Sequence, residues 1–391
     1  MPPTAPAPGP AAFARRLALA AALLLVSALA VAGDARALET KAKQAILIDA
    51  STGAVLLEKD ADTSMPPSSM SKMMTIYLLF DSLKSGSLSL DDSFAVSRRA
   101  WRWGGSKMWV LVDTRVRIED LIRGIIIHSG NDASIVVAEG LAGSEDAFAD
   151  MMNERAAAIG LENSRFVNAT GWPAEGQHVT ARDLAKLALR TIRDFPEYYH
   201  YYGEKNFTYN NIRQGNRNPL LYQNLGADGL KTGHTEAAGF GLTASAERNG
   251  RRLILVVNGL ESERDRSRES ARLLEWGFRE FDNYPLFTAG ETVEDAGVWL
   301  GRDKTVPLVV DRDVVVTLPR RARRNMKVSV VYEGPVPAPI AKGAQIASLR
   351  IAAPGFETIE LPLQAGADVA QLGFAGRLGA ALKQLVWGPA N

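Results

Sequence analysis

Short apolar segments separated by turn residues are typical of β-strands, and they occur early in the chain. Residues 44–50 and 53–59 flank a Ser-Thr-Gly turn, which predicts a β-hairpin. The longer apolar run at residues 76–80 follows Pro66-Pro67 and small polar residues, so it predicts a loop that enters a buried helix. We expect this helix to end near Gly86, because glycine readily adopts the left-handed conformation that terminates helices.

Helical spacing dominates the middle of the chain, and short β-prone segments return after it. The predicted helical segments are 118–127, 133–159 with Gly140 and Gly143 as interruptions, 184–192 and 268–283. The predicted strands are 207–212, 239–247 and 252–259. A chain that opens with strands, crosses to helices and returns to strands predicts one α/β (α+β) domain whose sheet is built from both ends of that region.

The last part of the chain has a different character. Residues 299–363 contain only short alternating runs divided by proline and glycine, which predicts a small all-β second domain. Residues 374–387 place Phe374, Leu378 and Leu382 on one face at helical spacing, so they predict an amphipathic helix that lies in a membrane surface. A helix packed on the second domain is the alternative interpretation.

The first 37 residues predict a secretory signal peptide. Arg15-Arg16 precede an apolar run over residues 17–32, and Ala35-Arg36-Ala37 supplies a small-x-small cleavage site. An uncleaved anchor is the alternative, but the run is short for a spanning helix. The expected organisation is therefore a signal peptide at 1–37, a catalytic domain at 38–286, a β domain at 287–366 and an anchor helix at 367–391.

Composition excludes several classes of function. The net charge of +1 gives no overall attraction to nucleic acid, and the chain has no cysteine for a thiolate nucleophile or a zinc-thiolate site. The histidines show no metal-ligand spacing, so we expect no metal and no cofactor. They are His128, His178, His200 and His234.

Candidate chemistry begins at the entry to the first helix. Ser69 and Lys72 are three residues apart, so a helix places their side chains next to each other. A lysine whose pKa is lowered by burial can take the serine proton and activate the hydroxyl. This spacing is common by chance, and taken alone a helix cap at Ser69 and a solvated Lys72 would be preferred.

Two further motifs change that balance. Ser129-Gly130-Asn131 follows an apolar helix, and its hydroxyl and carboxamide can relay a proton and hold a substrate amide. In Lys231-Thr232-Gly233-His234 the lysine and threonine can bind a carboxylate, while Gly233 lets a substrate lie along the strand edge. Each motif alone could be a loop, but the combination of S-x-x-K, S-x-N and K-T-G in this order is specific for enzymes that are acylated by penicillin.

The sequence resembles the low-molecular-mass penicillin-binding proteins that are D-alanyl-D-alanine carboxypeptidases, of the penicillin-binding protein 5/6 type. The stretches that carry the resemblance are 67–75, 121–132, 143–148, 213–218 and 228–239. The resemblance implies a transpeptidase-like catalytic domain with an antiparallel sheet, helices on both sides and a helical subdomain, followed by a β-sandwich. It also implies that the tail anchors the enzyme to the periplasmic face of the inner membrane.

The resemblance implies acyl transfer on a peptidoglycan stem peptide. Ser69, deprotonated by Lys72, would attack the carbonyl between the two terminal D-alanines, with the oxyanion held by the backbone N–H groups of Ser69 and His234. Water would then release the shortened peptide. A β-lactam would be trapped at the acyl stage.

The other motif residues have expected roles in the same reaction. Ser129 would pass a proton to the leaving amine, and Asn131 would orient the acyl chain. Lys231 and Thr232 would bind the terminal carboxylate. Arg217 would assist with that carboxylate or serve a structural purpose, and the sequence favours neither.

Three alternatives stay open at this point. A serine β-lactamase needs a deacylating glutamate, for which Glu175 is the candidate, but Gly130 stands where those enzymes have aspartate. A DD-endopeptidase would use the same residues on cross-linked peptides. A non-catalytic envelope protein that binds stem peptides is disfavoured because all three motifs are intact.

Overall fold

The computed structural model describes residues 38–379. The predicted signal peptide and the last part of the predicted tail helix, residues 380–391, lie outside the described residues. The segment from Thr40 onward forms one compact unit by its internal contacts.

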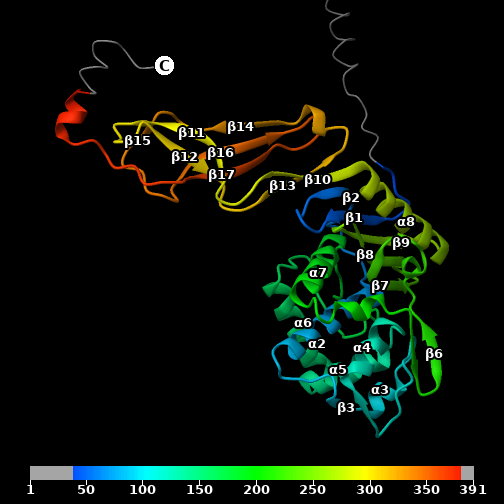
Figure 1. Ribbon diagram of the computed structural model, residues 1–391. Coiled ribbons are helices and arrows are strands. Elements are labelled where there is room, and N and C mark those ends of the chain that lie inside the picture. The colour runs from blue at the N-terminus through cyan, green and yellow to red at the C-terminus, as the bar shows by residue number, and fades with distance from the viewer. Residues whose placement is uncertain (1–37, 380–391) are drawn as a thin grey trace, which may run out of the picture. The chain divides into compact units, whose positions relative to one another are not determined.

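A five-stranded antiparallel sheet forms the centre of the catalytic domain (Figure 1). The first strands of the chain pair with strands that come about two hundred residues later, since Ala45 lies opposite Val257. This confirms that the sheet is built from both ends of the domain. In order across the sheet the strands are β2 (Val55–Lys59), β1 (Gln44–Asp49), β9 (Arg251–Leu260), β8 (Gly239–Arg248) and β7 (Ala227–Thr235).

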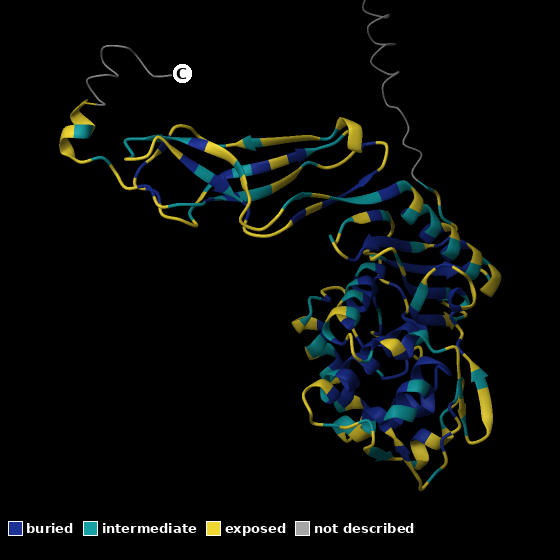
Figure 2. Ribbon diagram, viewed as in Figure 1, coloured by how far each residue is buried: buried dark blue, intermediate teal, exposed yellow. Residues whose placement is uncertain are grey.

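Helices cover both faces of this sheet. α7 (Ala181–Asp194) and α8 (Glu263–Glu280) pack against it from opposite sides, and β9 is consequently buried from Leu253 to its end (Figures 1 and 2). Thr180 caps the N-terminus of α7, because its hydroxyl accepts a hydrogen bond from the backbone N–H of Asp183.

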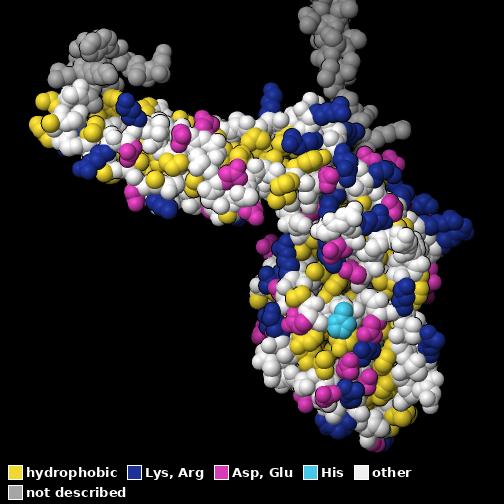
Figure 3. Space-filling view, viewed as in Figure 1, with side chains coloured by type: hydrophobic (Ala, Val, Ile, Leu, Met, Phe, Trp, Pro, Cys, Tyr) yellow, Lys and Arg dark blue, Asp and Glu magenta, His cyan; other side chains and the backbone are white. Residues whose placement is uncertain are grey.

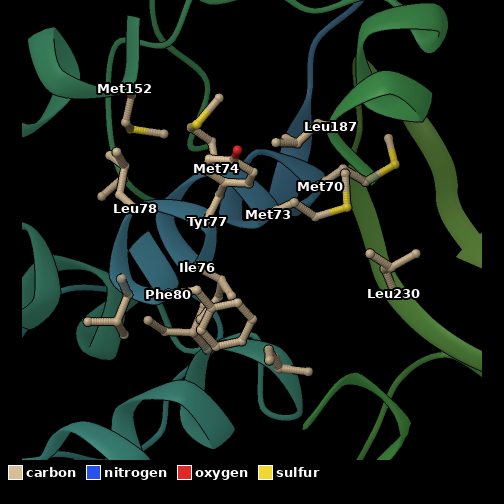
Figure 4. Packing of buried hydrophobic residues seen from close by; sticks show 14 of the residues in the cluster. Met70, Met73, Met74, Ile76, Tyr77, Leu78, Phe80, Met152, Leu187 and Leu230 are labelled. Carbon is tan, nitrogen blue, oxygen red and sulfur yellow. The ribbon is translucent and has the colours of Figure 1, made fainter. Parts of the chain in front are cut away.

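The rest of the catalytic domain includes a helical subdomain. Its helices are α2 (Lys72–Lys84), α3 (Arg98–Arg102), α4 (Ile118–Ile126), α5 (Asn131–Ala142) and α6 (Glu145–Ala158). α2 lies in the middle of the core: Met70 and Met73 point towards Leu230 of β7, whereas Leu78 points towards Met152 of α6 (Figure 4). Because side chains on every side of α2 are buried, its first turn is held rigidly in the domain.

Two short two-stranded sheets lie outside the main sheet. β3 (Ser93–Ala95) pairs with β4 (Arg115–Arg117), and β5 (Asn206–Tyr209) pairs with β6 (Ile212–Gly215). The prediction of one strand over 207–212 is wrong because Asn210 and Asn211 have φ angles of 46° and 62°. Two successive left-handed residues form the tight turn of a hairpin.

The C-terminal domain is all β, as predicted. A six-stranded sheet and the β10–β13 pair share one hydrophobic core that includes Val306, Leu349 and Leu318. The strands are β10 (Phe281–Phe287), β11 (Thr292–Trp299), β12 (Thr305–Val309), β13 (Val314–Pro319), β14 (Lys327–Val331), β15 (Val336–Pro337), β16 (Gln345–Ala352) and β17 (Ile359–Ala365). The predicted helix over 268–283 ends earlier, at Glu280, because residues 281–287 pair with β13.

The described part of the predicted tail helix, residues 374–379, is helical, and Phe374 and Leu378 are 77% and 55% exposed. Among residues 38–379 no helix is both long enough and apolar enough to cross a membrane. Lysine and arginine are interspersed with aspartate and glutamate over the face shown in Figure 3, in keeping with the net charge of +1.

Candidate active site

Ser69 lies in a turn of 3₁₀-helix, η1 (Ser68–Ser71), that leads directly into α2. The turn begins after Pro67 and includes Ser68 in a left-handed conformation, with φ of 49°. Lys72 is the first residue of α2 and is fully buried, while Ser69 is partly accessible. The local sequence therefore exposes the hydroxyl and buries the amine that lies next to it.

The ammonium position of Lys72 is surrounded by hydrogen-bond partners. Its Nζ lies 3.0 Å from Ser69 Oγ, 2.8 Å from Asn131 Oδ1 and 2.5 Å from the carbonyl oxygen of Thr170. Burial lowers the pKa of Lys72 to about 7, with a further lowering by the positive charge of Arg217. Lys72 is therefore neutral in a large fraction of molecules at neutral pH.

A neutral amine has two N–H donors and one lone pair. Asn131 Oδ1 and the Thr170 carbonyl accept the two donors, so the lone pair of Lys72 is left to accept the proton of the Ser69 hydroxyl. This arrangement can convert a weak nucleophile into a strong one.

The second predicted motif lies between α4 and α5, as expected. Ser129 is buried in a left-handed conformation with φ of 58°, and Asn131 begins α5. Asn131 is held on three sides: its backbone N–H donates to the Ser106 carbonyl, its amide nitrogen donates to the Gly104 carbonyl, and its amide oxygen accepts from Lys72. These three hydrogen bonds fix the amide of Asn131 beside Lys72.

The third motif lies on β7, the edge strand of the sheet. Lys231 and Thr232 are buried, and Lys231 Nζ donates to Ser129 Oγ at 3.0 Å. Burial and the nearby charges of Lys72, Arg217 and Arg266 hold the pKa of Lys231 well below its usual range. A carboxylate bound beside Lys231 would favour its protonated form.

The glycine of this motif permits close packing against the serine turn. A Cβ atom on Gly233 would lie 2.9 Å from Ser68 Cβ and 3.2 Å from the Pro67 carbonyl oxygen. β7 and η1 are therefore neighbours at the point where the oxyanion hole is predicted. His234 follows, and its exposed ring stacks on Phe240 with 3.9 Å between the ring centroids.

An open cavity of about 630 Å³ lies over Ser69. It is lined by Asn131 from the second motif, by His234 from the third and by Trp172 from the loop after the Thr170 carbonyl. Trp172 is 47% exposed and makes an edge contact with Trp103. The three motifs thus converge on one cavity large enough for the end of a peptide.

Arg217, Arg266 and Glu175 differ in how they lie relative to this cavity. The guanidinium of Arg217 donates to Ser106 Oγ at 2.6 Å, and Ser106 lines the cavity. Arg266 is buried over the ring of Phe240, 5.6 Å from its centroid. Glu175, the candidate deacylating base, is exposed and is not among the described residues that line the cavity.

Sequence reasoning assigned no role at Lys72 to the loop that supplies the Thr170 carbonyl. Asn168 Oδ1 accepts hydrogen bonds from the backbone N–H groups of Thr170, Gly171 and Trp172, and so shapes this loop. An asparagine three residues before a glycine was the available signal, since asparagine side chains form such turns.

Asp132 was also missed. Its buried carboxylate accepts from the backbone N–H groups of Met108, Trp109 and Val110, which fixes the segment that follows the cavity-lining residues Gly105 and Ser106. Its position directly after Asn131 was the only available sequence signal.

Within the described residues, no group of three or more histidine, aspartate or glutamate side chains could hold a metal ion. The three motifs bring together a hydroxyl on Ser69, the buried amines of Lys72 and Lys231, and the carboxamide of Asn131. These groups and this fold are those of a serine acyl-transfer enzyme.

Comparison with known proteins agrees with this class. A family model described as D-alanyl-D-alanine carboxypeptidase matches residues 31–262, and one described as the C-terminal domain of penicillin-binding protein 5 matches residues 281–371. The chain belongs to the D-alanyl-D-alanine carboxypeptidase family of serine peptidases, of the penicillin-binding protein 5/6 type.

Individual relatives cover most of the chain. It is 38% identical to D-alanyl-D-alanine carboxypeptidase DacC of Escherichia coli K12, over 93% of this chain and 94% of that protein. It is also 38% identical to DacA of the same organism, over 86% of each. Penicillin-binding protein 5 of Haemophilus influenzae has a similar structure, with a TM-score of 0.78 and 35% identity over 85% of this chain and 98% of that one.

Proposed function

We propose that this protein removes the terminal D-alanine from peptidoglycan stem pentapeptides through an acyl-enzyme on Ser69. The observation that carries the proposal is the environment of Lys72. Its Nζ lies 3.0 Å from Ser69 Oγ, and its two other hydrogen-bonding directions are taken by Asn131 and Thr170. A general base with this geometry and a pKa of about 7 suits activation of serine at neutral pH.

In the first step Lys72 takes the Ser69 proton while Oγ forms a bond to the carbonyl carbon of the penultimate D-alanine. The negative charge that develops on the carbonyl oxygen is stabilised by the backbone N–H groups of Ser69 and His234. Lys231 and Thr232 bind the terminal carboxylate, which orients the peptide along β7.

In the second step the C–N bond breaks and the leaving amine of D-alanine takes a proton from Ser129. The hydrogen bond from Lys231 Nζ to Ser129 Oγ supports this role, because a protonated lysine can replace the proton that the hydroxyl gives up. Lys72 passes the proton that it took from Ser69 to the Ser129–Lys231 pair, which restores both groups and leaves Lys72 neutral. Water, deprotonated by this neutral amine, then attacks the ester carbonyl. The C–O bond to Ser69 breaks, Ser69 Oγ takes the proton from Lys72 and the shortened peptide leaves.

A β-lactam presents a carbonyl and a carboxylate in a similar relation, so it acylates the same serine. Arg217 holds one wall of the cavity through Ser106, and we assign it a positioning role alongside its charge. Exposure of Glu175 disfavours a β-lactamase, which needs a base at the acyl group.

We place this activity in the periplasm, after cleavage of the signal peptide at 1–37, with the C-terminal helix lying in the inner-membrane surface. The exposed Phe374 and Leu378 support a helix that binds lipid. Vesicle flotation of the mature chain, with and without residues 374–391, tests the anchor; equal flotation of both would reject it.

The activity is tested by two measurements on the mature protein. Intact mass after penicillin treatment should rise by the mass of one penicillin in the wild type and not in Ser69→Ala. D-Alanine release should occur from a pentapeptide, and the rate on a cross-linked peptide dimer separates a carboxypeptidase from an endopeptidase. A mass gain that persists in Ser69→Ala would reject the assigned nucleophile.

A further inference from the structure

A second hollow lies on the same stretch of chain that forms one wall of the active-site cavity. Gly105 and Ser106 line the cavity together with Ser69, and the residues that follow, including Lys107 and Trp109, line a hollow of about 490 Å³. An extended chain spans at most about 3.6 Å per residue, so Ser106 and Trp109 lie within about 11 Å of each other. A ligand longer than one peptide end can therefore contact both.

The walls of this hollow are unusually apolar for an accessible surface. Trp101, Trp109, Leu111 and Ile212 are 39%, 49%, 52% and 40% exposed. Exposed clusters of large apolar side chains mark surfaces that bind other molecules, and tryptophan contributes most to such binding. None of these four side chains has a part in the acyl-transfer chemistry described above.

The structure holds Trp109 in place by its backbone. Trp109 has φ of 71°, a conformation that a bulky residue adopts only when its surroundings impose it. The Asp132 carboxylate accepts its N–H at 2.8 Å, and Asn210 Nδ2 donates to its carbonyl at 2.7 Å. The indole is thus presented on a fixed main chain instead of a free loop.

The hollow is also positively charged. Arg102 and Lys107 line it, no aspartate or glutamate lies among its described lining residues, and neither cation forms an ion pair with a described carboxylate. Lys107 Nζ lies 5.5 Å from the centre of the Trp109 ring. A complementary ligand has flat apolar faces to pack on indole rings and carboxylates to pair with the two cations.

We propose that this hollow binds the glycan strand to which the stem peptides are attached. The C–H faces of the sugar rings pack on Trp101 and Trp109, and carboxylates of the attached peptides pair with Arg102 and Lys107. The inference rests on the proposed function, since the peptide that reaches Ser69 is then carried on such a strand. An anionic membrane surface is the competing ligand. The glycan strand is favoured because residues 105–111 are one continuous segment that lines first the active-site cavity and then the hollow, so a strand that delivers a peptide to Ser69 can contact both.

The test compares two substrates that have the same scissile bond. One is a free N-acetylated tripeptide ending in D-Ala-D-Ala, and the other is a soluble, uncross-linked glycan strand that carries pentapeptides. We expect Trp109→Ala and Lys107→Gln together to lower kcat/KM on the strand about tenfold, and to leave kcat/KM on the tripeptide within twofold. Phe356→Ala, which truncates an aromatic side chain that is 37% exposed in the β domain, should change neither.

Failure of this inference differs from failure of the proposed function. An unchanged rate on the strand, or an equal loss on both substrates, would overturn the glycan site while the enzyme remains a carboxypeptidase. No D-alanine release by the wild type from either substrate would reject the proposed function itself.

Binding provides a second readout that needs no catalysis. Strands should sediment with Ser69→Ala protein, and less so when Trp109→Ala is added. If the added substitution instead weakens binding only to phosphatidylglycerol vesicles, the hollow is a membrane contact and the proposal is wrong.

Discussion

The pH dependence of acylation is the most direct test of the role of Lys72. Burial lowers its pKa from 10.5 to about 7, which corresponds to about 5 kcal/mol of preference for the neutral amine at about 1.4 kcal/mol per pH unit. About half of the molecules then carry a neutral base at pH 7, and about one tenth do so at pH 6. With an ordinary pKa of 10.5, only about one molecule in 3,000 would be competent at pH 7.

The second-order rate constant for acylation by a fluorescent penicillin should therefore rise about tenfold per unit below pH 6 and level off above pH 7.5. Stopped-flow fluorescence measures it, with near-UV circular dichroism to verify that the fold is unchanged across the range. At higher pH the rate should fall again as Lys231 loses the charge that binds the carboxylate. Its pKa is also lowered by burial, so this descending limb lies below pH 10.5.

Lys72→Arg is the matched control, because a guanidinium stays protonated throughout this range and cannot act as the base. The Lys72→Arg variant should not be acylated at any pH, although its guanidinium has the same positive charge as a protonated lysine. A wild-type rate that still climbs tenfold per unit between pH 8 and 9 would refute the assignment of a buried lysine base with a lowered pKa.

Two further predictions follow from the same geometry. Arg217→Ala removes a positive charge that lowers the pKa of Lys72. The rising part of the pH profile of acylation should therefore move to higher pH by up to about one unit. A higher KM with no such movement would mean that Arg217 only binds substrate. Gly171→Ala would place a Cβ 1.8 Å from the Ser68 carbonyl oxygen, and we expect it to abolish penicillin labelling and to destabilise the protein by about 3 kcal/mol or more. Gly176→Ala is its control, since Gly176 has a similar φ but no neighbour closer than 4.0 Å; it should cost only about 1 kcal/mol in thermal unfolding. Equal effects of the two substitutions would show that backbone strain, and not the contact with Ser68, limits position 171.

Much of the architecture could be predicted from the order of the sequence patterns. Apolar alternation identified the first hairpin, the strands near the end of the catalytic domain and the all-β character of the C-terminal domain. The end of the helix predicted over residues 268–283 was wrong because a local helical pattern competes there with strand pairing. The hydrophobic spacing of α8 continues past its last residue, but hydrogen bonds to β13 draw residues 281–287 into a strand, and pairing between distant segments leaves no local signature.

The chain by itself determined which groups carry the chemistry. Ser69 and Lys72 are three residues apart on a helix, so their proximity is a local property that the sequence contains. Only the tertiary structure decided that Lys72 is fully buried and that the Thr170 carbonyl completes its hydrogen bonds. Every residue has a backbone carbonyl, so the sequence does not indicate which carbonyl accepts the hydrogen bond from Lys72. The pKa of Lys72 is lowered to about 7 only because other parts of the chain exclude water from the amine.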